Sequence, residues 1–127
     1  GYEGLLIDVG NPHFVIFCED PCIVDLDVVG PQLEHDSVFP HRANIHFATV
    51  TGTDEITQRT WERGAGITLA CGSGATAGAA AARHEGLAGS SVRVRLPGGT
   101  LRIRFDEAGH ATMIGPAELS FIGYWGA

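Results

Sequence analysis

Short apolar runs alternate with glycine- and proline-rich breaks along most of the chain. Such runs, bounded by turn residues, are typical of β-strands. We predict strands at residues 4–8, 13–19, 44–51, 55–62, 92–96, 101–105, 110–114 and 117–124. The segment Gly10-Asn11-Pro12 predicts a tight turn between the first two strands. In the fourth strand, Ile56 and Trp61 break strict alternation.

Two segments before the third strand have less regular patterns. Residues 23–29 fit either a short strand or one helical turn, and Gly30-Pro31 follows them. Residues 31–42 are polar, with two prolines and two histidines, and they fit a loop or a short helix.

Residues 73–85 are nearly all Ala or Gly and predict a helix that is apolar on every side. We therefore expect this helix to be buried. Gly78 would cost about 1 kcal/mol relative to alanine in an exposed helix, but it suits a helix whose backbone packs tightly. Gly86 followed by Leu87 predicts a left-handed C-terminal cap with its apolar contact.

The two strands after the helix alternate apolar residues with arginine around Pro97-Gly98-Gly99-Thr100. This pattern predicts an antiparallel hairpin with one buried face. Its outer face carries four arginines, which we expect to be solvated rather than to bind phosphate or nucleic acid. They are Arg93, Arg95, Arg102 and Arg104.

Many short strands and one buried helix predict an α+β fold with a single domain over residues 1–127. We expect a strongly curved, mostly antiparallel β roll or barrel around one central Ala/Gly-rich helix.

Composition narrows the classes of function. The net charge of −7 argues against a nucleic-acid or anionic-membrane partner. No apolar run approaches the roughly 20 residues that span a bilayer, and no secretory signal pattern is visible, so we expect a cytoplasmic protein. The chain starts at Gly1 and passes almost directly into Leu5-Leu6-Ile7, so we expect it to be part of a longer protein.

Three cysteines, an odd number, do not make a disulfide framework. Cys18 and Cys22 could be metal ligands together with His13. Zinc sites usually have tighter paired spacings and a fourth ligand, so we predict no metal site.

Cys71 ends an apolar run and directly precedes Gly72-Ser73-Gly74 at the start of the predicted helix. The unpaired N–H groups and the positive dipole end of a helix favour thiolate over thiol. The same N–H groups can hold a carboxylate beside the sulfur. The charged pair Glu62 and Arg63 lies just upstream. This combination suits proton transfer at a carbon next to a carboxylate.

Three other functions for the segment around Cys71 can be compared with proton transfer. A buried structural cysteine is the ordinary alternative. A cysteine hydrolase would use a histidine base such as His13, His46 or His84, but the spacing alone supports none of them. Gly72-Ser73-Gly74 misses the dinucleotide-binding fingerprint, because the third glycine comes one position late.

Several motifs, in the same order, resemble the C-terminal half of the diaminopimelate epimerase family, which belongs to the cofactor-independent amino-acid racemases and epimerases. The motifs are Gly10-Asn11-Pro12-His13, Asn44 within a strand, Glu62-Arg63-Gly64-Ala65-Gly66, Ala70-Cys71-Gly72-Ser73-Gly74, and Gly115-Pro116 before the last strand. Together they cover nearly the whole chain.

The resemblance implies two pseudo-symmetric halves with the active site between them, and one cysteine from each half. The family's other half, with its own Cys-Gly-Asn-Gly type motif, is absent from this sequence. By the resemblance, Cys71 is the acid/base of this half, and no cofactor takes part. Gly72 and Ser73 would donate backbone N–H groups to the substrate α-carboxylate.

The resemblance also implies a binding site for the rest of the substrate. Asn11, Asn44 and Arg63 would hold the distal end of diaminopimelate. Glu62 would take an ammonium group and, with His13, help to set protonation near the partner thiol.

We therefore expect half of an isomerase that converts L,L- to meso-diaminopimelate by two-base proton transfer, for lysine and peptidoglycan precursor biosynthesis. Inversion needs groups on both faces of the carbon, so the fragment alone is expected to be inactive. Its expected partners are diaminopimelate and the N-terminal half of the same enzyme, and a homodimer is allowed. The alternatives are a non-catalytic ligand-binding module of the same fold, or a related enzyme acting on another amino acid.

Overall fold

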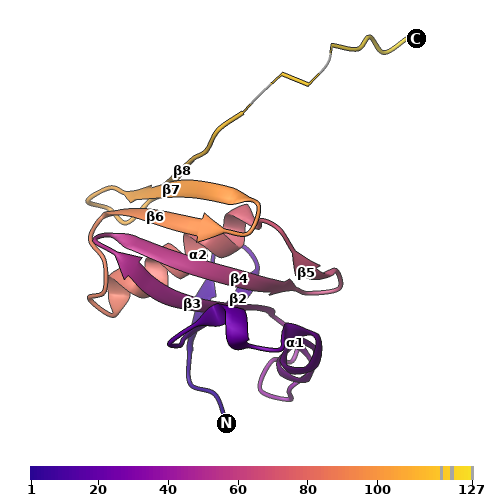
Figure 1. The fold of residues 1–127 in the computed structure, drawn as a ribbon, viewed down its shortest axis with the longest axis vertical. Coiled ribbons are helices and arrows are strands. Elements are labelled where there is room, and N and C mark those ends of the chain that lie inside the picture. Colours follow the sequence, from indigo (N-terminus) through magenta and orange to yellow (C-terminus); the bar gives the residue numbers. More distant parts are fainter. Residues whose placement is uncertain (118, 121, 127) are drawn as a thin grey trace.

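The computed structural model describes residues 1–117, 119–120 and 122–126, and its sheet curls around one helix (Figure 1). The strands are β1 (Leu5–Asp8), β2 (Pro12–Phe17), β3 (Asn44–Gly52), β4 (Glu55–Glu62), β5 (Gly66–Thr68), β6 (Ser91–Leu96), β7 (Gly99–Phe105) and β8 (Ala111–Ile114). The helices are the 3₁₀ turn η1 (Pro21–Ile23), α1 (Leu26–Glu34) and α2 (Gly72–His84). This arrangement confirms the predicted α+β class and the central Ala/Gly-rich helix.

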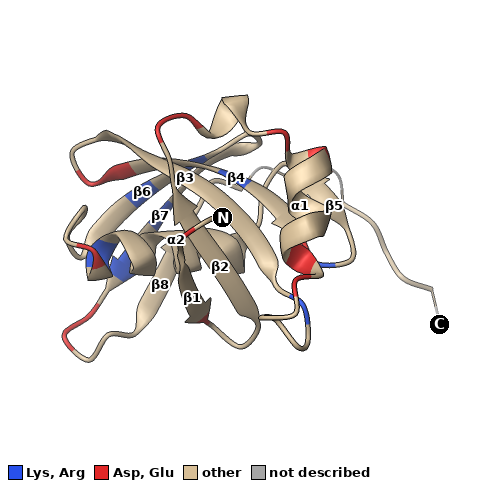
Figure 2. Ribbon diagram, turned by 90° about the horizontal axis from the view of Figure 1, so that it is seen from below, with Lys and Arg blue, Asp and Glu red and all other residues tan. Residues whose placement is uncertain are grey.

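The strands form one sheet in the order β1-β2-β3-β4-β6-β7-β8, and β5 adds to β4. Two pairs are parallel, β2 with β3 and β4 with β6, and the other pairs are antiparallel. The parallel pairs need crossovers. The first crossover runs through η1 and α1 on the outer face, and the second runs through α2 inside the curl (Figures 1 and 2).

Small side chains let α2 lie against the sheet on several sides. Its residues Ala75, Ala79 and Ala82 pack into a cluster with the apolar residues of β6 and β7. On another side, Ala77 and Ala81 pack with Val15 of β2. At Gly74 and Gly78 an added methyl group would collide with the side chains of His46 and Gln58, respectively. The prediction that Gly78 serves close packing is therefore confirmed.

One stripe of α2 is less buried than we expected. Gly72, Ser73, Thr76 and Ala80 are half-buried and line grooves between β1 and the end of the β7–β8 hairpin. The reason is that β1 and β8 are the two ends of the sheet and do not pair with each other, so the roll is not closed. Figure 2 shows these two edge strands beside α2.

Both ends of α2 are capped. At the N-terminus, the Cys71 side chain takes the N-cap position. At the C-terminus, Gly86 has a φ of 73°, and the Leu87 N–H donates to the carbonyl of Ala82 at 2.8 Å. This is the predicted left-handed cap.

The hairpin of β6 and β7 has the predicted polarity. Val92, Val94 and Ile103 are buried against the helix, whereas the four arginines that alternate with them are exposed. The guanidinium groups of Arg93 and Arg95 lie 3.4 and 3.8 Å from the Glu55 carboxylate.

Helix α1 resolves the two irregular segments. The sequence analysis allowed a short strand or one helical turn before Gly30-Pro31, whereas the helix runs through this pair to Glu34. Packing explains the difference, because Leu26, Gly30 and Glu34 are spaced four residues apart and form its buried face. Gly30 lies directly against the Trp61 indole, so no larger residue fits at that position.

The strand predicted at 117–124 is wrong for the residues that the structure describes there; residues 118 and 121 lie outside the description. Beyond Gly115-Pro116 the described chain leads away from the sheet, as Figure 1 shows, and pairs with none of its strands. A strand needs a partner, and here the apolar side chains of Leu119, Ile122 and Trp125 are exposed instead.

Candidate active site

Cys71 lies where the chain passes from β5 into α2. Its Sγ accepts a hydrogen bond from the Gly74 N–H at 3.3 Å and lies 3.7 Å from the Ser73 hydroxyl. The Ala75 N–H bonds to the Cys71 carbonyl at 2.8 Å. The N–H groups of Gly72 and Ser73 have no protein partner among the residues that the structure describes. They are therefore available, at the positive end of the helix dipole, to an anion in the groove beside β1 and β8.

The expectation that Cys71 favours the thiolate is not met in this chain. The Cys71 residue is 9% exposed, and burial raises the pKa of its thiol above the ordinary value. The hydrogen bonds from Gly74 and Ser73 act in the opposite direction but are weaker, and the charge of Glu62 raises the pKa further. Desolvation therefore outweighs the helix terminus, and at neutral pH the group is a neutral proton donor.

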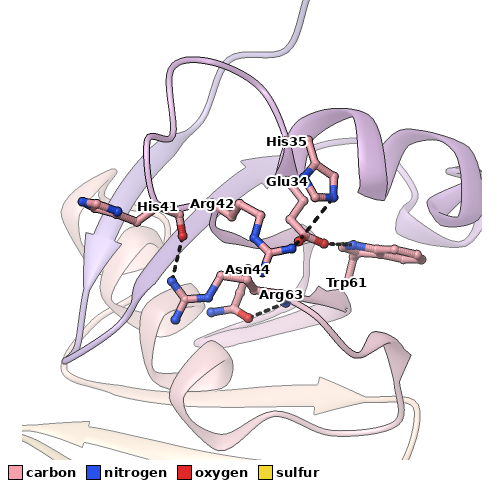
Figure 3. A network of polar contacts seen from close by, with 7 residues as sticks. All are labelled: Glu34, His35, His41, Arg42, Asn44, Trp61 and Arg63. Atoms are coloured by element: carbon pink, nitrogen blue, oxygen red, sulfur yellow. Dashed lines mark hydrogen bonds and ion pairs between the residues drawn. The ribbon is translucent and has the colours of Figure 1, made fainter.

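The side chain of Asn44, at the start of β3, is hydrogen-bonded to the start of β2 and to the residue that follows β4. Its Oδ1 accepts from the Arg63 N–H at 2.8 Å, and its Nδ2 donates to the Pro12 carbonyl at 3.1 Å. The Arg63 guanidinium donates to the carbonyl of His41 at 3.0 Å (Figure 3). Two of the predicted binding residues are thus adjacent, and Asn44 helps to position Arg63.

Behind this pair, a buried carboxylate anchors the loop that supplies His41. The side chain of Glu34 is 4% exposed, accepts a hydrogen bond from the Trp61 indole at 2.9 Å, and lies 3.0 Å from the Arg42 guanidinium (Figure 3). Arg42 has a positive φ of 62°, which is unusual for a residue with a side chain. The sequence analysis missed this anchor, since a glutamate within the irregular polar segment 31–42 gave no sign of burial.

His13 and Asn11 meet at the start of β2. The Asn11 side-chain oxygen lies 3.0 Å from His13 Nε2. His13 is fully buried, and burial lowers its pKa, with Arg63 contributing in the same direction. The charges of Asp8 and Glu62 oppose that shift. His13 is therefore a neutral imidazole within the electrostatic reach of Glu62 and Arg63.

The structure also brings in three buried polar residues that the sequence analysis did not place in a site: His46, Gln58 and Thr60. From the sequence, His46 is a candidate only for the base of a cysteine hydrolase. A signal was present, because polar residues occupy alternate positions at 44 and 46 and at 58, 60 and 62. Alternation puts each set on one face of its strand, here the face toward α2.

Within residues 1–117, 119–120 and 122–126, no group of three or more His, Cys, Asp or Glu side chains is arranged to hold a metal ion. Cys18 is half-buried and Cys22 is exposed. No helix in the described part of the chain is long and apolar enough to cross a membrane.

Solved structures share this curled sheet and central helix. A phenazine biosynthesis protein of the PhzF family from Enterococcus faecalis matches 84% of this chain with a TM-score of 0.59 and 17% identity, over 40% of its own length. A putative phenazine biosynthesis protein from Clostridium difficile matches 77% with a TM-score of 0.57 and 16% identity, over 35% of its length. The fold of this chain is therefore of the same class as that of these PhzF-family proteins, a sheet curled around a central helix. In this chain a cysteine caps that helix.

Sequence comparison gives the family. The diaminopimelate epimerase family model matches residues 5–120, and the chain belongs to that family. Diaminopimelate epimerases from Erythrobacter litoralis and Bacteroides thetaiotaomicron are 50% and 47% identical to it over 122 and 123 residues. These matches cover 94% and 96% of this chain but only 45% and 46% of those proteins. The chain thus spans about half the length of these relatives.

Proposed function

We propose that this chain is the C-terminal half of a diaminopimelate epimerase and supplies one of the two groups that exchange a proton with the substrate. The observation that carries this proposal is the first turn of α2. There a neutral thiol caps the helix beside two backbone N–H groups that are open to a ligand. Family membership supports the same proposal.

The first turn of α2 supports both parts of the proton transfer. The Gly72 and Ser73 N–H groups hold the α-carboxylate and stabilise the negative charge that develops as the α-proton leaves. Cys71, kept protonated by burial, returns a proton to the opposite face of the carbon. The base that removes the first proton comes from the N-terminal half, because one thiol cannot reach both faces. In the reverse reaction the two groups exchange roles.

The remaining site residues bind the rest of diaminopimelate. The Arg63 guanidinium, oriented by the His41 carbonyl, holds the distal carboxylate. Asn11 and Asn44 hold the same end, with Asn44 also positioning the Arg63 backbone. Glu62 takes an ammonium group and, with His13, influences protonation near the partner thiol. The reaction needs no cofactor and would serve lysine and peptidoglycan precursor biosynthesis in the cytoplasm.

The experiment is α-proton exchange of diaminopimelate in heavy water, followed by NMR. We expect no exchange with this chain alone and measurable exchange after adding a separately produced N-terminal half from a close relative, such as the Erythrobacter litoralis epimerase. Cys71→Ser in the mixture is expected to abolish exchange. Cys22→Ser is the matched control, because Cys22 is exposed and outside the site.

Two outcomes contradict the proposal. Exchange by the chain alone would show that a second thiol is unnecessary. A mixture that binds diaminopimelate without exchanging its α-proton would indicate a binding module instead. Running the same assay with other amino acids tests the substrate.

A further inference from the structure

A chain of hydrogen bonds runs from the first turn of α2 to Asn11. The Gln58 amide donates to the Gly74 carbonyl at 2.9 Å, and the same nitrogen lies 3.3 Å from His46 Nδ1. His46 Nε2 lies 2.7 Å from His13 Nδ1. His13 Nε2 in turn lies 3.0 Å from Asn11 Oδ1. Both imidazoles are fully buried and stacked, with ring centroids 5.0 Å apart.

The direction of every bond in this chain follows from one fixed acceptor, the Gly74 carbonyl. A carbonyl can only accept, so Gln58 must turn its NH₂ group toward it. The second hydrogen of that NH₂ group then faces His46 Nδ1, which must be an unprotonated acceptor. The Thr60 hydroxyl lies 2.8 Å from the same nitrogen, so once Nδ1 is unprotonated it is the nearer donor to the single lone pair, and the Gln58 N–H at 3.3 Å is the more distant one. His46 therefore carries its proton on Nε2.

The same reasoning extends outward from His46. Its Nε2–H donates to His13 Nδ1, so His13 also carries its proton on Nε2. That proton is donated to Asn11 Oδ1. Because the Asn11 oxygen accepts the hydrogen bond from His13, the Asn11 NH₂ group remains to donate to another partner.

We propose that His46 is a positioning residue for the active site. Through His46 and His13, the Gly74 carbonyl in the first turn of α2 determines which atom of Asn11 accepts a hydrogen bond and which atoms donate. In this arrangement Asn11 presents hydrogen-bond donors to the substrate, which suit a carboxylate group and not an ammonium group. This consequence for the substrate rests on the proposed function, whereas the tautomers and the direction of the bonds do not.

The electrostatic surroundings keep both rings neutral, which the chain of bonds requires. Burial lowers the pKa of His46 to about 3, with the neighbouring His13 contributing. The charged groups that act on His13 are Asp8 from β1 and Glu62 and Arg63 from the end of β4. A protonated ring would donate from both nitrogens and place two donors face to face.

The first test is NMR of the 127-residue chain with ¹⁵N-labelled histidine, which distinguishes the two neutral tautomers. We expect both His13 and His46 to carry the proton on Nε2 at pH 7. A His13 or His46 ring with its proton on Nδ1 would overturn the proposal. This measurement needs no substitution, no substrate and no partner half.

The second test compares two substitutions of similar polarity. In His46→Gln the longer amide can still donate to His13 Nδ1, whereas in His46→Asn the amide is too short to reach it. We expect His13 to keep its Nε2–H tautomer in His46→Gln and to show a mixture of tautomers in His46→Asn. Identical His13 spectra in the two variants would contradict the role of His46. If neither variant folds, the tautomers of the unsubstituted chain decide.

Activity separates this inference from the proposed function. In the mixture with the N-terminal half, we expect His46→Asn to raise KM for diaminopimelate about tenfold with a smaller effect on kcat, as for one lost hydrogen bond, and His46→Gln to restore most of it. A matching fall in kcat with unchanged KM would argue against positioning of Asn11. If the unsubstituted mixture does not exchange protons at all, the proposed function fails while the tautomer result stands.

Discussion

Replacing Gly78 with alanine tests whether the interior of the roll limits the helix that carries Cys71. The methyl group would collide with the Gln58 side-chain oxygen and come within 3.3 Å of Ile56. In an isolated helix the same change would stabilise by about 1 kcal/mol. The sign of the effect therefore distinguishes helix propensity from packing.

The size of the change in the free energy of unfolding follows from the displacement of the Gln58 side chain. Overpacking a closely packed interior costs about 1–3 kcal/mol. Moving Gln58 also breaks its buried hydrogen bond to the Gly74 carbonyl, which costs a further 1–3 kcal/mol or so. After subtracting the gain in helix propensity, we expect Gly78→Ala to lower the free energy of unfolding by about 1–5 kcal/mol, with a central value of about 3 kcal/mol. For a domain of this size the central value lowers Tm by roughly 10 °C.

Urea denaturation of Gly78→Ala, Gln58→Ala and the double variant measures the effect and its cause. Gln58→Ala removes the obstructing group, so we expect the double variant to be more stable than the sum of the two single changes predicts, by about 1 kcal/mol or more. Ala80→Gly, on the half-buried stripe of the same helix, is the control and should cost about 1 kcal/mol through propensity alone. A Gly78→Ala variant as stable as the original chain would refute the packing argument.

Two further predictions concern titration and thiol reactivity. Because the pKa of His46 is lowered to about 3 in the folded chain, unfolded chains bind more protons below pH 6.5, and the free energy of unfolding should fall by about 2 kcal/mol from this group between pH 8 and pH 5. Urea midpoints across that range should show a clearly smaller fall in His46→Gln, and an equal fall would contradict the assignment. In the chain alone, iodoacetamide should modify exposed Cys22 well before Cys71, because burial shields the Cys71 thiol and raises its pKa. Mass spectrometry of digests follows both thiols, and equal rates would contradict this account of Cys71.

The elements predicted correctly from the sequence are those whose signals are local. The Ala/Gly run gave the helix at Gly72–His84 to within one residue at each end, and Gly86-Leu87 gave its cap. Alternating arginines gave the outer face of β6 and β7. Each depends on a periodicity or a φ preference that neighbouring residues already contain.

Elements that depend on contacts between distant parts of the chain were missed, because no local pattern in the sequence indicates those contacts. Helix α1 runs through Gly30-Pro31 because Gly30 lies against Trp61, which is 31 positions away in the sequence. Likewise the position of Cys71 predicted a thiolate, but the pKa depends on how much protein surrounds the sulfur, which its neighbours in sequence do not reveal. The candidate residues were found through motifs, whereas their hydrogen-bond partners were not.

Topology explains why residues from four separate segments converge at one end of the roll. Parallel pairing of β2 with β3 sets His13 opposite Asn44, so the start of both strands lies at the same end. Antiparallel pairing then returns β4 to that end, where Glu62 and Arg63 follow Trp61, the partner of Ile45. From there the short β5 strand leads directly into Cys71 and α2.

The two crossover helices therefore do more than cover the sheet, since α1 anchors the loop that orients Arg63 and α2 places the thiol. A change that loosens either helix should consequently disturb binding or proton transfer without touching a residue of the site.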